Sequence, residues 1–140
     1  MNNVNRPRHR TLVLTGAAIA AFGLGFCVVA VALPDLLVRL YALAASGGTV
    51  PDAGASSRFG AALCGALMLG WGVMMVMLGR GSSLPRAAVA SALAWFVADS
   101  TCSALTGFPW NAASNLLFLA PFLSMLPALA SRPRSEPALG

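Results

Sequence analysis

The chain has 140 residues, of which 58% are hydrophobic and 9% are charged, and its mean hydropathy is +0.78. A soluble domain carries about 25% charged residues, so these values exclude an ordinary water-soluble domain and a disordered chain. The net charge is +5, and all basic residues are arginines that mostly flank apolar stretches, which favours membrane orientation over nucleic-acid binding.

The first part of the chain predicts a tail followed by a membrane span. Residues 1–10 are polar and carry three arginines, so we expect a mobile tail. Residues 11–33 carry no charge and are long enough to cross a bilayer. A cleaved signal peptide is the alternative for this stretch, because Ala30-Val31-Ala32 imitates a cleavage site.

A short helix at the membrane surface is expected after this span. Asp35 and Arg39 are spaced i,i+4, and Tyr41 is expected at the interface. Another side of this helix would carry Leu36, Leu40 and Leu43. Residues 46–57 are small, polar and rich in glycine, which predicts an exposed loop.

Three more spans are predicted, at about 58–79, 86–107 and 110–130, so the membrane domain covers 11–130 and a second tail covers 131–140. Gly81 is expected to end the second span, and Ser83 with Pro85 to begin the third. The turn at Gly107 is so short that the last two spans must be antiparallel neighbours, and Pro121 should kink the fourth.

Together these elements predict an all-α membrane protein, a four-transmembrane-helix bundle with a short interfacial helix after the first span. With the N-terminus inside, seven arginines lie on the inner side and two, Arg39 and Arg58, on the outer side. Both termini are therefore expected in the cytoplasm. Arginine in place of lysine, with abundant alanine, favours a bacterial source and hence the cytoplasmic (inner) membrane.

Asp99 is the only acidic residue inside any predicted span. A carboxylate at the centre of a span costs about 2.5–3.5 kcal/mol on insertion scales, and such residues usually face the protein interior. Helical geometry places Trp95 and Ser103 in the same sector of the third span, and Asn111, Asn115, Phe118 and Phe122 in one sector of the fourth.

Depth along the helices brings these sectors to the same level. Asp99 lies about 12 Å before the end of its span, and Asn115 about 9 Å after the start of the next. Arg58 begins the second span on the same outer side and can reach inward. We therefore predict one cluster in the outer half of the membrane, made of Arg58, Asp99, Ser103, Asn111 and Asn115. The aromatic rings of Trp95 and Phe118 are expected to form its walls. Arg39 is the second candidate partner for Asp99.

Three roles are open for Asp99: hydrogen-bonded attachment of helices, a ligand or proton site, and catalysis. No nucleophile–base pair, phosphate-binding loop, cofactor motif or metal-ligand spacing occurs in the sequence. The three cysteines lie apart inside apolar stretches and are expected to be packing residues. We therefore expect no enzyme, no metal and no cofactor.

Two groups of residues resemble small bacterial four-helix membrane proteins, the DoxX-like proteins and neighbouring domain-of-unknown-function families. The first group is Pro34-Asp35-Leu36-Leu37 with Arg58-Phe59-Gly60-Ala61-Ala62 and Gly70, and the second is Trp95 to Ser100 with Gly107, Asn111 and Asn115. The resemblance implies a four-helix bundle in the cytoplasmic membrane and no particular reaction. It marks Arg58 and Asp99 as candidate functional positions.

The expected function is therefore that of a non-enzymatic membrane protein with an outer-half polar cluster that packs helices or binds a partner. The expected partners are membrane lipids, a small lipophilic ligand or a membrane subunit, with homo-oligomers as a further option and nucleic acid excluded. The alternative is a small proton-coupled transporter that uses Asp99, as a homodimer because four helices enclose a narrow pathway.

Overall fold

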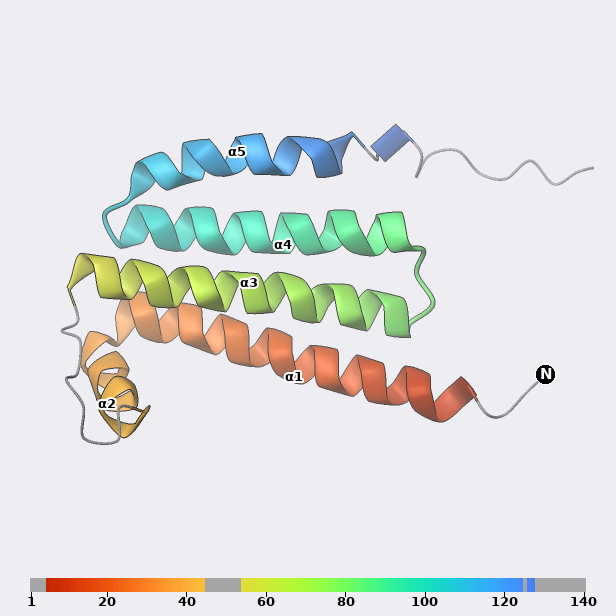
Figure 1. The fold of residues 1–140 in the computed structure, drawn as a ribbon, viewed down its shortest axis with the longest axis horizontal. Coiled ribbons are helices and arrows are strands. Elements are labelled where there is room, and N and C mark those ends of the chain that lie inside the picture. Colours follow the sequence, from red (N-terminus) through yellow and green to blue (C-terminus); the bar gives the residue numbers. More distant parts are fainter. Residues whose placement is uncertain (1–4, 45–53, 125, 128–140) are drawn as a thin grey trace, which may run out of the picture.

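A computed structural model describes residues 5–44, 54–124 and 126–127 of the chain. Its described part is helical and contains no strand. The helices run in the order α1 (Asn5–Ala32), α2 (Pro34–Ala44), α3 (Ala55–Gly79), α4 (Leu84–Leu105) and α5 (Pro109–Leu123) (Figure 1). The predicted all-α class is confirmed.

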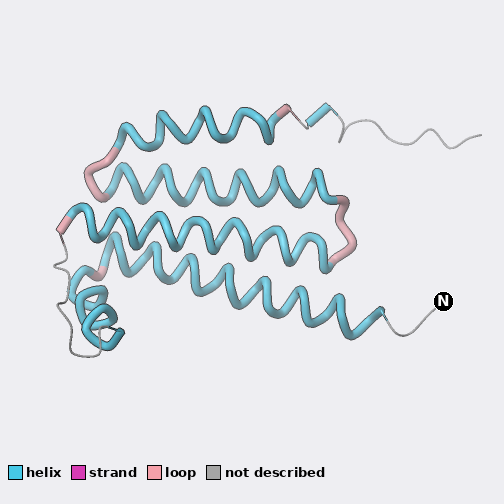
Figure 2. Tube along the Cα trace, in the orientation of Figure 1, coloured by secondary structure: helices cyan, strands magenta, loops and turns pink. Residues whose placement is uncertain are grey.

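The four longer helices lie side by side in a row, in the order α1, α3, α4, α5 (Figures 1 and 2). Each packs on its neighbour in this order, and α2 turns away from the end of α1. Helices α1 and α5 lie at opposite edges of this row, because α5 packs chiefly on α4 and α1 chiefly on α3.

Within the described residues, three helical segments are long and apolar enough to cross a membrane, namely His9–Ala32, Ala55–Gly79 and Leu84–Leu105. The protein is therefore an all-helical, membrane-embedded protein. The described part of α5 has 15 residues, fewer than the roughly 20 that a span needs. Part of the segment that the sequence predicts as its continuation, up to residue 130, lies outside the described residues.

The most extensive helix contact is the seam between α1 and α3, and glycines form it. Gly16 and Gly23 of α1 face Gly72 and Gly65 of α3, and a Cβ atom on any of the four would lie 2.5–2.8 Å from a backbone atom of the partner helix. The glycines are spaced seven residues apart on both helices, so the antiparallel helices meet repeatedly at backbone distance. Small residues drive helix association in membranes through this close approach.

Several predicted boundaries hold and others shift. Gly81 and Gly107 have φ angles of 82° and 96°, which confirms them as turn residues, and Ser83 is the N-cap of α4 with Pro85 in its first turn. Residues 5–10, predicted as tail, are instead the start of α1. A helix tolerates Pro7 there because the first-turn N–H groups have no intrahelical partner. Residues 1–4 of the predicted tail and most of the predicted loop at 46–57 lie outside the described residues.

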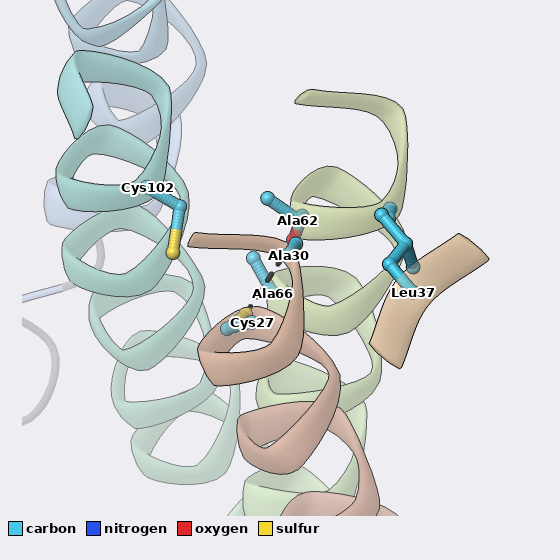
Figure 3. Close-up of a cluster of buried hydrophobic side chains, with 7 residues drawn as sticks. Cys27, Ala30, Leu37, Ala62, Ala66 and Cys102 are labelled. Atoms are coloured by element: carbon cyan, nitrogen blue, oxygen red, sulfur yellow. Dashed lines mark hydrogen bonds between the residues drawn. The ribbon is translucent and has the colours of Figure 1, made fainter. Parts of the chain in front are cut away.

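Helix α2 forms where it was expected. Leu36, Leu40 and Leu43 are exposed, whereas Leu37 is fully buried. Figure 3 shows Leu37 beside small residues of α1 and α3, with which it belongs to one buried cluster. This cluster consists of Cys27, Ala30, Leu37, Ala61, Ala62, Ala66 and Cys102.

Candidate functional site

Asp99 lies on α4 and is one of the most deeply buried side chains of the described part, with 1% of its surface exposed. Three side chains donate hydrogen bonds to its carboxyl group. Ser103 donates to Oδ1 at 3.2 Å, Asn111 donates to Oδ2 at 3.2 Å, and Asn115 donates to Oδ2 at 2.7 Å. The structure thus brings together Asp99, Ser103, Asn111 and Asn115.

The donors are themselves linked, so the four residues form a connected network. Asn111 also donates to the Ser103 hydroxyl at 2.9 Å, and Asn115 also donates to the Ser100 hydroxyl at 3.4 Å. Asp99 and Ser103 are one turn apart on α4, and Asn111 and Asn115 are one turn apart on α5, so each pair lies on one helix face. The network joins α4 to α5 through buried hydrogen bonds.

The turn between α4 and α5 sets the register of this network. Gly107 reverses the chain, Pro109 begins α5, and the Thr106 hydroxyl donates to the Cys102 carbonyl at 2.8 Å. Phe108 of the turn stacks on Phe59 of α3 with ring centroids 4.6 Å apart. The turn is therefore held to both neighbouring helices, and the residues after it face Asp99.

Asp99, Asn111 and Asn115 line an open groove of about 770 Å³ between α3, α4 and α5. Apart from Ser91, its other walls are apolar or aromatic, and they include the predicted wall residues Trp95 and Phe118. The sequence did not single out the contribution of α3, which consists of Leu63, Leu67, Gly70 and Trp71. Binding sites for small molecules commonly enclose about 300–1,000 Å³ and combine apolar walls with a few polar groups.

Arg58 does not join this cluster, which corrects the prediction. Its Nε donates to the Ala30 carbonyl at 2.9 Å and its Nη2 to the Val31 carbonyl at 2.8 Å, and no ion pair links this described side chain to Asp99. The cause is Pro34, because proline has no N–H with which to satisfy the Ala30 carbonyl one turn earlier. Arg58 replaces that donor and places its positive charge at the carbonyl end of α1.

Arg39, the second predicted partner of Asp99, is also placed elsewhere. It lies exposed on α2, and neither Asp35 nor Asp99 forms an ion pair with it in the described part of the chain. An i,i+4 spacing on an exposed helix face stabilises by only about 0.2–0.5 kcal/mol, which is too little to fix two solvated side chains. The predicted set of eight residues thus divides into six at the groove or its network and two arginines elsewhere.

A second groove, of about 680 Å³, lies between α1 and α4 beside α3. Its lining is apolar except for Thr101 and two thiols, those of Cys27 and Cys102. The Cys27 thiol donates to the Ala62 carbonyl at 3.5 Å, and all three cysteines of the chain are free. This groove resembles the Asp99 groove in size but lacks a charged or amide side chain to orient a ligand.

The site therefore belongs to a membrane-embedded helical protein in which the buried carboxyl group of Asp99 lines a largely apolar groove. Comparisons with protein-family models, with curated proteins and with solved structures found no match to this chain.

Proposed function

We propose that the chain crosses the bacterial cytoplasmic membrane four times, keeps both termini in the cytoplasm and binds a small lipophilic molecule in the Asp99 groove. The observation that carries the binding role is that Asp99, Asn111 and Asn115 line the 770 Å³ groove together with apolar and aromatic side chains. The role is one of binding and not of catalysis. The same network also attaches α5 to α4.

The four-span topology is supported by the distribution of arginines and by the antiparallel turn at Gly107. Trp110, beside that turn, is 85% exposed, which suits a side chain in the outer aromatic belt. The close glycine seam between α1 and α3 supports a first span that stays part of the mature protein.

The topology is tested with single cysteines in a cysteine-free variant in whole cells. Trp110→Cys should react with a membrane-impermeant maleimide in intact cells, and Ser82→Cys should react only after the membrane is opened. The opposite labelling pattern would reverse the proposed orientation. Labelling of both positions from the same side would contradict the single proposed membrane crossing between them.

The binding role is tested by photolabelling the protein in phosphatidylcholine nanodiscs with a neutral fatty alcohol that carries a diazirine. The label should map to residues of the Asp99 groove and be displaced by excess decanol. Leu67→Trp should reduce this labelling, because Leu67 lines the groove and is 54% exposed, which leaves room for a larger side chain.

The matched control is Leu24→Trp, since Leu24 is 53% exposed and lines the second groove. This variant should leave the labelling of the Asp99 groove unchanged. Labelling spread evenly over the lipid-facing residues of both grooves, with no effect of Leu67→Trp, would contradict the binding role.

A further inference from the structure

Asp99, Asn111 and Asn115, here called the polar floor of the Asp99 groove, leave acceptor atoms rather than donors free for a ligand. The Asp99 carboxyl group receives its three hydrogen bonds from neutral groups, two amides and one hydroxyl. Asn111 and Asn115 use their N–H groups for these contacts, and within the described part of the chain no hydrogen bond reaches their amide oxygens. Neither oxygen is sealed, because Trp95 Nε1 is the only described side-chain polar atom that is both buried and unpartnered.

No cation of the described chain complements this floor. Arg58 is held by two carbonyl groups of α1, and Arg39 is exposed on α2. Arg80 and Arg86 lie at the opposite ends of α3 and α4, on either side of the turn that joins these helices. A carboxylate inside a protein is costly to keep charged unless a positive charge or a full set of hydrogen bonds accompanies it. Among the described residues, hydrogen bonds accompany the Asp99 carboxyl group but no positive charge does.

The walls of the groove favour a positive charge as well. Four aromatic side chains line it, namely Trp71, Trp95, Phe118 and Phe122. The face of an aromatic ring attracts a cation, and the attraction strengthens where water is excluded. The rest of the lining is leucine, alanine and glycine together with one serine, so the groove offers apolar surface to the remainder of a ligand.

We propose that the Asp99 groove binds a lipophilic amine in its ammonium form, with the nitrogen at Asp99 and the Asn111 and Asn115 oxygens and the apolar part along α3 and α5. An ammonium group has up to three N–H donors and no acceptor, which matches a floor made of oxygens. This inference rests on the proposed binding role and adds to it the charge of the ligand.

Three ligands with the same ten-carbon tail should differ in affinity for the groove, because their head groups differ in charge. Decylamine carries a positive head, decanol a neutral head that both donates and accepts, and decanoate a negative head near neutral pH. Decanol satisfies one oxygen and leaves the carboxylate without a positive partner. Decanoate brings a second negative charge toward Asp99, which repels it.

The test measures equilibrium binding of radiolabelled decylamine to the full chain in phosphatidylcholine nanodiscs, with empty nanodiscs subtracted as the lipid background. Unlabelled decylamine, decanol and decanoate serve as competitors. We expect decylamine to bind about tenfold or more tightly than decanol, and decanoate to bind most weakly. Asp99→Asn should reduce decylamine affinity to that of decanol, because it removes the charge and keeps the shape of the side chain.

The wild-type comparison needs no variant, so it decides the proposal even if Asp99→Asn fails to fold. Equal affinities of decylamine and decanol, both reduced by Leu67→Trp, would overturn the ammonium proposal and leave the binding role intact. Loss of specific binding for all three ligands would overturn both. Leu24→Trp, on the other groove, should change none of these affinities.

Two sources can supply such an ammonium group, a free amine and a lipid headgroup, and the lipid of the nanodisc distinguishes them. Phosphatidylethanolamine carries N–H donors on its headgroup, whereas phosphatidylcholine carries none. A fall in decylamine affinity in phosphatidylethanolamine nanodiscs supports the ammonium site and identifies the headgroup as its occupant. An unchanged affinity, together with tighter binding of decylamine than of decanol, identifies a free amine as the occupant.

Discussion

Gly23→Ala should destabilise the protein, although alanine is the better helix former. A Cβ atom on Gly23 would lie 2.5 Å from the Gly65 carbonyl oxygen and 2.6 Å from the Leu69 backbone nitrogen, where ordinary contacts begin at 3.4 Å. Both obstacles are backbone atoms and cannot rotate away. Helices α1 and α3 must therefore move apart by about 0.9 Å at this point, the difference between 3.4 and 2.5 Å.

The magnitude follows from a comparison with Gly25→Ala, two residues further along α1. No atom lies within 4 Å of a Cβ on Gly25, so this variant gains the helix preference of alanine, about 0.5–1 kcal/mol, without any clash. Because both variants share that gain, the difference between them isolates the clash. Overpacking of this kind costs about 1–3 kcal/mol, so Gly23→Ala should be less stable than Gly25→Ala by that amount.

The assay is equilibrium unfolding in mixed detergent micelles by added dodecyl sulfate, followed by far-ultraviolet circular dichroism. The same comparison can be made on α3 with Gly65→Ala, whose Cβ would meet the backbone of α1, and with Gly60→Ala, whose Cβ would meet nothing within 4 Å. Equal stability of Gly23→Ala and Gly25→Ala would refute the backbone seam between α1 and α3.

Three further predictions concern other parts of the molecule. Arg58→Leu should lower the free energy of unfolding by about 1.5–3 kcal/mol, since it removes charged hydrogen bonds to two carbonyl groups of α1. Arg39→Leu should change that free energy by less than about 0.5 kcal/mol. The same unfolding assay measures both variants, and equal effects would contradict the role of Arg58. Asn115→Leu should lower it by about 1 kcal/mol, because it removes the 2.7 Å hydrogen bond to Asp99; an unchanged unfolding curve would show that this bond contributes nothing to the attachment of α5. Cys64 is exposed and should react with a membrane-permeant maleimide in the folded protein, whereas the buried Cys27 should react only after unfolding. Mass spectrometry of the labelled protein identifies the modified cysteine. Modification of Cys27 in the folded protein would contradict its place in the core.

The sequence placed the Asp99 network correctly in geometric terms because only local rules were needed. The i,i+4 spacing fixed which residues share a face of α4 or α5. The short turn at Gly107 then fixed the two helices as antiparallel neighbours, so that Asn111 and Asn115 reach the level of Asp99. No long-range register had to be guessed.

The prediction for Arg58 was wrong because its hydrogen-bond partner depends on the long-range register between α1 and α3. Charge complementarity favoured Asp99, yet the glycine seam sets α3 against α1 so that Arg58 lies beside the Ala30 carbonyl. Gly16 and Gly23 carried the signal, since their seven-residue spacing matches that of Gly65 and Gly72. The missing N–H of Pro34 then made the end of α1 a better site for a guanidinium group than a carboxyl group already supplied with donors.

The two outer seams of the row hold their helices by different means, and this difference bears on the groove. Helix α1 is held by repeated backbone contact along much of its length, and its polar contacts with α3 lie near the end of α1, where Arg58 and Cys27 form hydrogen bonds. Helix α5 has a less extensive contact with α4, and its buried polar contacts with that helix converge on Asp99. A ligand that binds at Asp99 therefore exchanges hydrogen bonds with the same groups that attach α5, so occupancy of the groove and the attachment of α5 are linked. The α1–α3 pair shares none of these groups and stays a fixed support for the site.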